Sequence, residues 1–369
     1  MTNALQRLSA LGTSIWLDDL SRSRLTNPEN DNSLKNLIEN YSVVGVTTNP
    51  SIFDNALKDS QTYAETFAVL KKDGASVDQA IRKVTTTDVR DACDLFIDTY
   101  QRSNGVDGRV SIEVDPRLAH NTQETIIQGR ELWNEVGREN LFIKVPATLA
   151  GLPAIELLIS EGISVNVTLI FSTQRYEEVL LAYVSGIEKR LASGADISQI
   201  QSVASFFVSR VDTAIDPILD LMQSNDGAPL RGKAAVANAH LAYEIFLNFI
   251  QSDRWKKLAD SGASPQRLLW ASTGVKDPKY LKDKYVTELA APWTVNTMPE
   301  QTLRAVHDLN PKIQDAISSE VINAHKILQD LAALGIDYSK VVADLEVDGI
   351  KKFEESWQHL LQTVKQALA

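Results

Sequence analysis

The chain has 369 residues, and its 37 Lys and Arg against 48 Asp and Glu give a formal net charge of −11. Hydrophobic residues make up 44% and charged residues 23%, which is typical of a globular protein and excludes a disordered, collagen-like or disulfide-rich chain. The acidic balance, without long basic runs, argues against a nucleic-acid partner, because clustered Lys and Arg bind phosphate backbones. A local basic pocket for a small phosphate is compatible with that charge.

The single cysteine, Cys93, excludes a disulfide within the chain and a cysteine-based metal site. It lies in a helical pattern, where we expect a buried and inert side chain. The five histidines lack the spacing of metal ligands, so no metal is expected. The N-terminal residues do not resemble a secretory signal, and no apolar run reaches the ~18 residues of a membrane span. We therefore expect a cytoplasmic protein without a membrane partner.

Short apolar segments alternate with longer amphipathic ones along the chain. The short segments have the length and the content of Val, Ile, Leu or Phe that is typical of buried strands. The predicted strands are 13–18, 42–47, 109–114, 141–145, 163–168, 202–208, 267–271 and 293–296. The predicted helices are 121–137, 153–161, 173–193, 233–252, 299–334 and 349–369.

Strands that alternate with helices predict a parallel sheet, and eight such units close naturally into a barrel. We therefore predict an α/β protein with one domain over residues 1–369, a (β/α)8 TIM barrel with extra terminal helices. A doubly wound open sheet is the structural rival, but the glycine fingerprint of its dinucleotide-binding version is missing. Half-exposed antiparallel strands fit less well, because long helical segments separate the strands.

Three predicted strands have one aliphatic face and one face that becomes polar towards the strand end, where barrel active sites lie. The polar faces carry Ser111 and Glu113, then Lys144, then Ser164, Asn166 and Thr168. We expect these side chains to point into the barrel.

Lys144 is the strongest candidate nucleophile, because it interrupts an apolar strand. Burial favours the neutral amine of a lysine, which can attack a ketone and form a Schiff base. The alternative is a structural lysine whose stem is buried and whose charge reaches water. Asp18 and Glu113 are candidate inward carboxylates, whereas Asp19 is expected to be a helix N-cap or loop residue.

Arg210 follows an apolar strand, where its guanidinium could hold a phosphate, with a surface ion pair to Asp212 as the alternative. Other polar side chains follow neighbouring strands. Ser205, Ser272 and Lys276 could complete an anion pocket, while Asn166 and Thr168 need hydrogen-bond partners such as sugar hydroxyls. Asn49 precedes a proline, so a turn is its alternative reading.

Together these segments resemble the transaldolase family, particularly its longer bacterial members, over essentially the whole chain. The resemblance rests on IWLDDLSR, VGVTTNPSIF, VSIEVDPRLAHNT, LFIKVPAT, GISVNVTLIFS, ASFFVSRVD, WASTGVKDP and the closing LEVDGIKKFEESWQHLL. It implies a (β/α)8 barrel and a class I Schiff-base mechanism without a cofactor. It also implies transfer of a dihydroxyacetone unit in the pentose phosphate pathway, from sedoheptulose 7-phosphate or fructose 6-phosphate to glyceraldehyde 3-phosphate or erythrose 4-phosphate.

The resemblance also implies roles for individual residues. It makes Lys144 the Schiff-base lysine and Asp18 the acid and base of carbon–carbon cleavage, while Glu113 and Thr168 move protons through a water. The implied ligands of the sugar and its phosphate are Asn49, Asn166, Ser205 and Arg210. The segment 271–276 lacks the arginine that many family members carry near Ser272, so Lys276 is the candidate replacement.

Two other functions remain open from the sequence. One is an aldolase of the fructose-6-phosphate type, which forms the same imine but releases free dihydroxyacetone. The other is a non-catalytic barrel that binds sugar phosphates. In each case the expected partners are small-molecule sugar phosphates, and the protein is expected to be a monomer or a homodimer.

Overall fold

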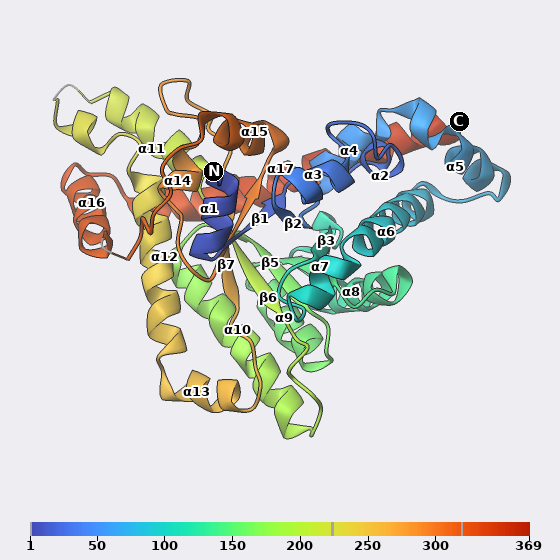
Figure 1. Ribbon diagram of the computed structural model, residues 1–369, viewed down its shortest axis with the longest axis horizontal. Helices are drawn as coiled ribbons and strands as arrows, with labels where there is room; N and C mark the ends of the chain where they lie inside the picture. Colours follow the sequence, from blue (N-terminus) through green and yellow to red (C-terminus); the bar gives the residue numbers. More distant parts are fainter. Residues whose placement is uncertain (1, 223–224, 319) are drawn as a thin grey trace.

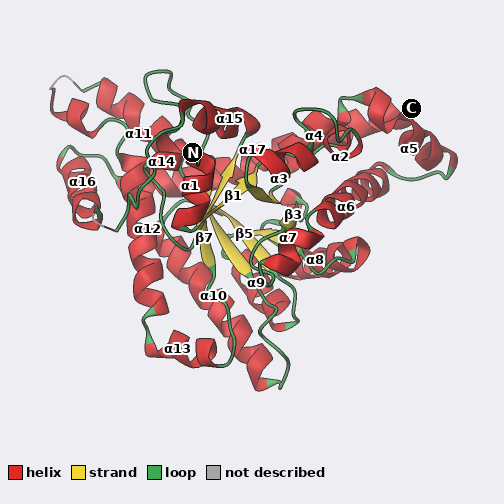
Figure 2. Cartoon of the chain, viewed as in Figure 1, coloured by secondary structure: helices red, strands yellow, loops and turns green. Residues whose placement is uncertain are grey.

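A computed structural model describes residues 2–222, 225–318 and 320–369 of the chain. In these ranges eight parallel strands form a closed barrel, in which each strand pairs with the next and the last pairs with the first. Figure 2 shows the strands at the centre of the molecule, with helices around them. The strands are β1 (Thr13–Leu17), β2 (Val43–Val46), β3 (Arg109–Glu113), β4 (Leu141–Pro146), β5 (Val165–Ile170), β6 (Ser202–Phe207), β7 (Arg267–Ala271) and β8 (Thr294–Met298). The eight predicted strands and the barrel are confirmed, and the open-sheet alternative is wrong.

Helices surround the barrel, and further helices precede the first strand and follow the last one. They are α1 (Ala4–Leu11), α2 (Arg22–Thr26), α3 (Leu34–Asn40), α4 (Pro50–Leu57), α5 (Ser60–Lys72), α6 (Val77–Leu95), α7 (Ile97–Arg102), α8 (Thr122–Val136), α9 (Gly151–Ser160), α10 (Thr173–Ala192), α11 (Ser209–Asp220), α12 (Ala234–Ile250), α13 (Asp253–Asp260), α14 (Lys284–Thr287), α15 (Glu300–Leu309), α16 (Val321–Ala333) and α17 (Tyr338–Leu368), with short 3-10 helices η1 (Pro116–Leu118) and η2 (Asn225–Leu230). None of the described helices is both long and apolar enough to cross a membrane.

Two predicted helices have the wrong extent. The segment 299–334 is not one helix, because α15 ends where Asn310 adopts a left-handed conformation (φ 47°) and Pro311 follows. The C-terminal helix α17 is longer than predicted and has 31 residues, because it begins at Tyr338 after an N-terminal cap by Asp337. The predicted helices also omit α2 to α5 between β1 and β3, whereas the helical pattern expected around Cys93 is confirmed by α6.

The alternation predicted for the strands is present in the barrel. Ile143 and Val145 of β4 pack among the helices, while Phe142 joins an apolar cluster inside the barrel with Trp16. Space for the indole of Trp16 depends on a glycine, because a Cβ on Gly45 would lie 2.6 Å from that ring. The barrel interior therefore contains an apolar cluster around Trp16 and Phe142.

Helix α17 covers the barrel at the carboxyl ends of the strands. It contacts α4, α6, α11, η1 and β5, and in Figure 1 it crosses behind the strands towards α5. Gly349 allows the close approach, because a Cβ there would lie 3.2 Å from Phe171 and 3.3 Å from Leu169. Ile350 and Phe353 extend the apolar cluster of the barrel interior, so α17 forms part of the roof over the strand ends.

Candidate active site

Most of the predicted site residues surround one cavity of about 680 Å3 at the carboxyl ends of the strands. The predicted residues that line it are Asp18, Asn49, Lys144, Thr168, Ser205, Arg210, Ser272 and Lys276. Glu113 and Asn166 do not line this cavity, although each is adjacent to Lys144 in the pairing of neighbouring strands. The barrel therefore brings together residues from positions 18 to 276 of the chain.

Lys144 is held from two sides near the end of β4. Its Nζ lies 3.1 Å from Oε2 of Glu113 and donates a hydrogen bond of 3.0 Å to the carbonyl oxygen of Thr48. The side chains of Lys144 and Glu113 are only 5% and 3% exposed. The ring of Phe353, on α17, has its centre 5.6 Å from Nζ. The amine is thus fixed at the cavity wall and shielded from bulk water.

Glu113 carries a carboxyl group whose charged form is disfavoured by its surroundings. Burial raises its pKa to about 7, although the charge of Lys144 acts in the opposite direction. Apart from this ion pair, its two carboxyl oxygens have no hydrogen-bond partner among the described residues. A carboxyl group with a pKa near neutral can both give and accept a proton.

Asp18 faces the cavity directly after β1. Its backbone N–H continues the pairing with β8 through a 2.8 Å hydrogen bond to Met298, which fixes the direction of the side chain. The hydroxyl of Thr47 donates a 2.7 Å hydrogen bond to Oδ1. Burial raises the pKa of Asp18, and the nearby charge of Lys144 and the Thr47 hydrogen bond oppose this rise. Asp18 is consequently a second candidate proton acceptor.

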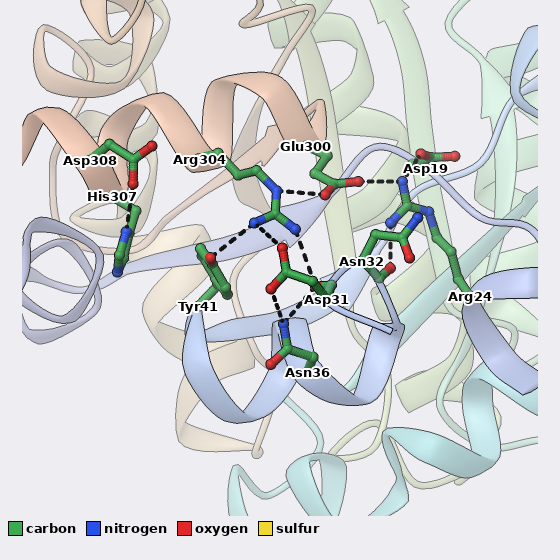
Figure 3. A network of polar contacts seen from close by, with 10 residues as sticks. All are labelled: Asp19, Arg24, Asp31, Asn32, Asn36, Tyr41, Glu300, Arg304, His307 and Asp308. Carbon is green, nitrogen blue, oxygen red and sulfur yellow. Dashed lines mark hydrogen bonds and ion pairs between the residues drawn. The ribbon is translucent and has the colours of Figure 1, made fainter. Parts of the chain in front are cut away.

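Asp19 does not line the cavity, and it belongs to a polar network that braces the loop after β1 (Figure 3). It accepts a 2.6 Å ion pair from Arg24, which also contacts Glu300 of α15 at 2.6 Å. Arg304 contacts the second oxygen of Glu300, also at 2.6 Å. The prediction of a loop position for Asp19 is confirmed, and this network anchors the segment that carries Asp18.

Asn166 lies beneath the cavity and supports its wall. Its amide nitrogen donates to Oγ of Ser111 at 3.0 Å, and its oxygen accepts from Oγ of Ser205 at 2.7 Å. Thr168 lies closer to the strand end, and its buried hydroxyl has no partner among the described residues. The next residue, Leu169, has a φ of 61° where the β5–β6 register shifts, so Thr168 ends the regular alternation of β5.

Asn49 follows β2 and caps the N-terminus of α4. Its Oδ1 accepts a 3.0 Å hydrogen bond from the backbone N–H of Ile52, so the Asn-Pro pair begins a helix and does not form the turn of the alternative reading. Asn49 also lines the cavity. Its amide group is therefore oriented by the helix and remains next to the space that a ligand would occupy.

Cationic residues lie at the side of the cavity formed after β6 and β7. Arg210 is the second residue of α11, and its guanidinium lies 5.2 Å from the ring centre of Phe207. Its Nη1 is buried without a partner among the described residues. The alternative ion pair to Asp212 is wrong, because Asp212 instead accepts hydrogen bonds from Ala235 N at 2.8 Å and Tyr285 at 2.7 Å.

The loop after β7 supplies the other candidate anion ligands. Ser272 has a φ of 56°, and its Oγ lies 3.0 Å from Oγ of Ser209 at the start of α11. Lys276 is exposed at the rim of the same cavity. Two cations and a serine hydroxyl at one side make this region suitable for an anion such as a phosphate group.

Some residues at the cavity were missed by the sequence patterns. Thr47, Phe207, Thr297 and Phe353 line it as well. Thr47 stands at the end of a predicted strand, beside the Asn49 turn, so its position was a usable signal. Phe353 comes from α17, more than two hundred residues after Lys144, and nothing local in the sequence indicates that the two meet.

The comparisons with known proteins agree with this geometry. Residues 15–364 match the family described as transaldolase/fructose-6-phosphate aldolase. A protein named transaldolase from Mycobacterium tuberculosis is 56% identical over 362 residues, which are 98% of this chain and 96% of that protein. Transaldolases from Mycolicibacterium smegmatis and Saccharopolyspora erythraea are 55% and 52% identical, over 98% and 99% of this chain and 96% and 97% of their own lengths. The chain therefore belongs to the transaldolase/fructose-6-phosphate aldolase family.

Proposed function

We propose that this protein is a transaldolase of the pentose phosphate pathway that acts in the cytoplasm. It transfers a dihydroxyacetone unit from sedoheptulose 7-phosphate or fructose 6-phosphate to glyceraldehyde 3-phosphate or erythrose 4-phosphate. The observation that carries the proposal is the placement of Lys144 Nζ at the cavity wall, 3.1 Å from a carboxyl group whose pKa is raised to about 7. This is a nucleophilic amine with its proton-transfer partner, in a chain that belongs to the corresponding family.

The reaction begins when the neutral amine of Lys144 attacks the C2 carbonyl carbon of the ketose. The resulting carbinolamine must lose its hydroxyl as water, which requires proton transfers to oxygen and from nitrogen. Glu113 and the unpartnered hydroxyl of Thr168 are assigned to these transfers, with a water between them. The product is a protonated imine, and this imine serves as the electron sink, so the proposed reaction uses no cofactor or metal.

Asp18 is assigned to the cleavage step. Its carboxylate takes the proton from the C4 hydroxyl, the C3–C4 bond breaks, and the bonding electrons move towards the imine to form an enamine. The aldose phosphate leaves, and the enamine adds to the carbonyl of a second aldose phosphate by the reverse steps. Thr47, which donates to Asp18 at 2.7 Å, keeps the carboxylate aimed at the cavity.

Substrate binding is assigned to the two ends of the cavity. Arg210, Ser272 and Lys276 receive the phosphate group, with Ser205 beside them on β6. Asn49 contacts the sugar directly. Asn166 acts from below, because its hydrogen bond fixes Ser205. The partners are thus small-molecule sugar phosphates, and the protein works as a monomer or homodimer.

An aldolase that releases free dihydroxyacetone is the second candidate, because the family name includes both activities. Both enzymes use the same imine, and they differ in the fate of the enamine. Free dihydroxyacetone should be measured with fructose 6-phosphate alone and again with added erythrose 4-phosphate. Release that greatly exceeds transfer in the presence of the acceptor would favour the aldolase. A non-catalytic barrel would bind the sugar without turnover.

The decisive experiment is reductive trapping with borohydride and fructose 6-phosphate, without an acceptor, followed by peptide mass mapping. A three-carbon adduct on Lys144 is expected, because the aldose phosphate leaves before reduction. Lys144→Met serves as the matched control and should show no adduct. An unmodified wild-type protein that is folded and binds the sugar would refute the proposal, and an adduct on another lysine would refute the assignment of Lys144.

A further inference from the structure

Lys276 lies on the boundary between two cavities. It lines the active-site cavity, and it also lines a neighbouring cavity of about 630 Å3 between α11, η2 and the loop after β7. The neighbouring cavity is lined by three carboxylates, those of Asp212, Asp216 and Asp277. A flexible ammonium group is attracted to carboxylates on one side and to a bound phosphate on the other. Lys276 therefore lies between an acidic cavity and the cavity that would hold a substrate.

In the structure, Lys276 faces the active site. Its Nζ lies 3.8 Å from the position that a Cβ would take on Gly274, which lines the active-site cavity. Burial raises the pKa of Asp18, and Lys276 is one of the positive charges that oppose this rise. The positive charge of Lys276 thus reaches the active-site cavity.

Arg231 occupies the acidic cavity and engages the carboxylate next to Lys276. Its Nη2 lies 2.6 Å from Oδ2 of Asp277, and its Nε lies 2.8 Å from Oδ1 of Asp220. Its Nη1 donates to the hydroxyl of Tyr280 at 2.8 Å. A single guanidinium therefore neutralises Asp277 and contacts a second residue of the same loop.

The other two carboxylates of this cavity are satisfied by neutral donors. Asp216 accepts hydrogen bonds from Gly232 N at 2.8 Å and from the hydroxyl of Tyr280 at 2.6 Å. Asp212 accepts from Ala235 N and Tyr285, as described above. Asp277 differs from them because, besides a 2.9 Å hydrogen bond from the backbone N–H of Lys279, it forms an ion pair with Arg231. Without Arg231, the carboxylate of Asp277, which directly follows Lys276 in the chain, would compete with a bound phosphate for the ammonium of Lys276.

We propose that Arg231 is a positioning residue for phosphate recognition, which engages Asp277 and anchors the loop after β7 so that Lys276 faces the phosphate of the substrate. This inference rests on the proposed function. Arg231 does not contact the substrate in this arrangement, and it acts through Lys276. The consequence is selectivity for phosphorylated over unphosphorylated sugars.

The test compares Arg231→Gln with wild type in two measurements. The first is the KM for erythrose 4-phosphate and for unphosphorylated erythrose, each with fructose 6-phosphate as the fixed donor. The second is the inhibition constant of inorganic phosphate, which probes the anion pocket alone. Arg254→Gln is the matched control. Arg254 contacts both oxygens of Glu188, at 2.8 Å for each bond, on the outside of the barrel, as Arg231 contacts both oxygens of Asp220, at 2.8 and 3.1 Å.

Arg231→Gln is expected to raise both the KM for erythrose 4-phosphate and the inhibition constant of phosphate by ~10-fold or more, the usual scale for losing one charge-assisted contact. The kcat/KM for erythrose should stay within about twofold, and the double variant Arg231→Gln/Asp277→Asn should recover most of the loss. Equal losses for both acceptors, no recovery in the double variant, or the same effect in Arg254→Gln would overturn the proposal.

A variant that fails to fold would not end the test. Arg231→Lys keeps the charge but cannot contact Asp277, Asp220 and Tyr280 together, and it should show the same selective effect at a smaller size. Trapping of the three-carbon adduct in wild type separates the two hypotheses. Its absence refutes the proposed function, whereas a trapped adduct together with an unchanged phosphate affinity in both Arg231 variants refutes this inference alone.

Discussion

Replacement of Asp18 by asparagine should separate imine formation from carbon–carbon cleavage. Asparagine keeps the shape of the side chain and an oxygen that can accept the 2.7 Å hydrogen bond of Thr47, but it cannot take a proton. Lys144 and Glu113 are untouched, and their 3.1 Å contact is on a different pair of strands. The imine should therefore still form, while the step that needs a base at C4 is slowed.

The size of the effect follows from the role of the group. Loss of a positioned general base costs roughly 10²–10⁴ in rate, which corresponds to about 3–5 kcal/mol in the activation free energy. The change in unfolding free energy should be small, about 1 kcal/mol or less, because the hydrogen bond from Thr47 can be kept. Catalysis and stability are thus expected to separate in this variant.

The assay has two parts and one matched control. Release of glyceraldehyde 3-phosphate from fructose 6-phosphate measures cleavage, and borohydride trapping with mass analysis measures the imine. Asp18→Asn should trap the intact six-carbon adduct, where wild type traps the three-carbon unit. Asp330→Asn is the control, because Asp330 is a partly exposed carboxylate on α16 that pairs with Lys326 at 2.7 Å, outside the cavity. Cleavage within threefold of wild type would refute the role of Asp18, and no trapped imine would show that Asp18 acts earlier.

Three further predictions concern the core and the buried groups. Burial raises the pKa of Glu113 to about 7, so the folded state holds this proton more tightly than the unfolded state, and ionisation lowers stability as the pH rises from about 4.5 to about 7. As the pH rises from about 5 to about 8, the unfolding free energy of Glu113→Gln should therefore increase by roughly 1–3 kcal/mol relative to that of wild type. Urea unfolding measures this difference. Gly45→Ala should lower the free energy of unfolding by roughly 1–3 kcal/mol, because the new Cβ would lie 2.6 Å from the Trp16 ring. Cys93 is fully buried, and burial raises the pKa of its thiol, so a thiol reagent should label the protein only after unfolding.

Each of these predictions has a clear contrary result. A pH-independent difference between Glu113→Gln and wild type would contradict the raised pKa. The double variant Gly45→Ala/Trp16→Phe should regain part of the lost stability, and strictly additive losses would mean that the ring contact is not the cause. Rapid labelling of Cys93 in the native protein would show that the helix α6 opens locally.

Much of the fold could be predicted because it depends on local properties of the chain. Side chains alternate along any strand, so Lys144 and Phe142 had to share the face opposite Ile143 once the segment was extended. The break in the predicted helix 299–334 was also local, since Asn310 and Pro311 are a common helix end, and this signal was overlooked. The predicted start of α17 is too late, although Tyr338, Val342 and Leu345 recur at helical spacing before Gly349 and pack against the core.

The sequence could predict which residues belong to the candidate site, but not how they are arranged in it. The sequence placed Asp18, Lys144 and Thr168 at strand ends, and a barrel brings all strand ends to one face. It could not distinguish Asn166, which supports Ser205 from beneath the cavity, from Asn49, which borders the cavity. The sequence predicts that Asn166 points inward from a strand, and it leaves a turn as the alternative for Asn49. It does not predict how deep each amide group lies along the barrel axis.

By itself, the sequence determined the eight strands, the inward direction of the lysine and carboxylates, and the family to which the chain belongs. The tertiary structure decided which groups touch: Glu113 against Lys144 through the β3–β4 register, Phe353 of α17 over the amine, and Arg231 beside the loop of Lys276. The physical reason is that backbone alternation is set by neighbouring residues, whereas contacts between residues far apart in the sequence depend on closure of the barrel and on how its outer helices pack.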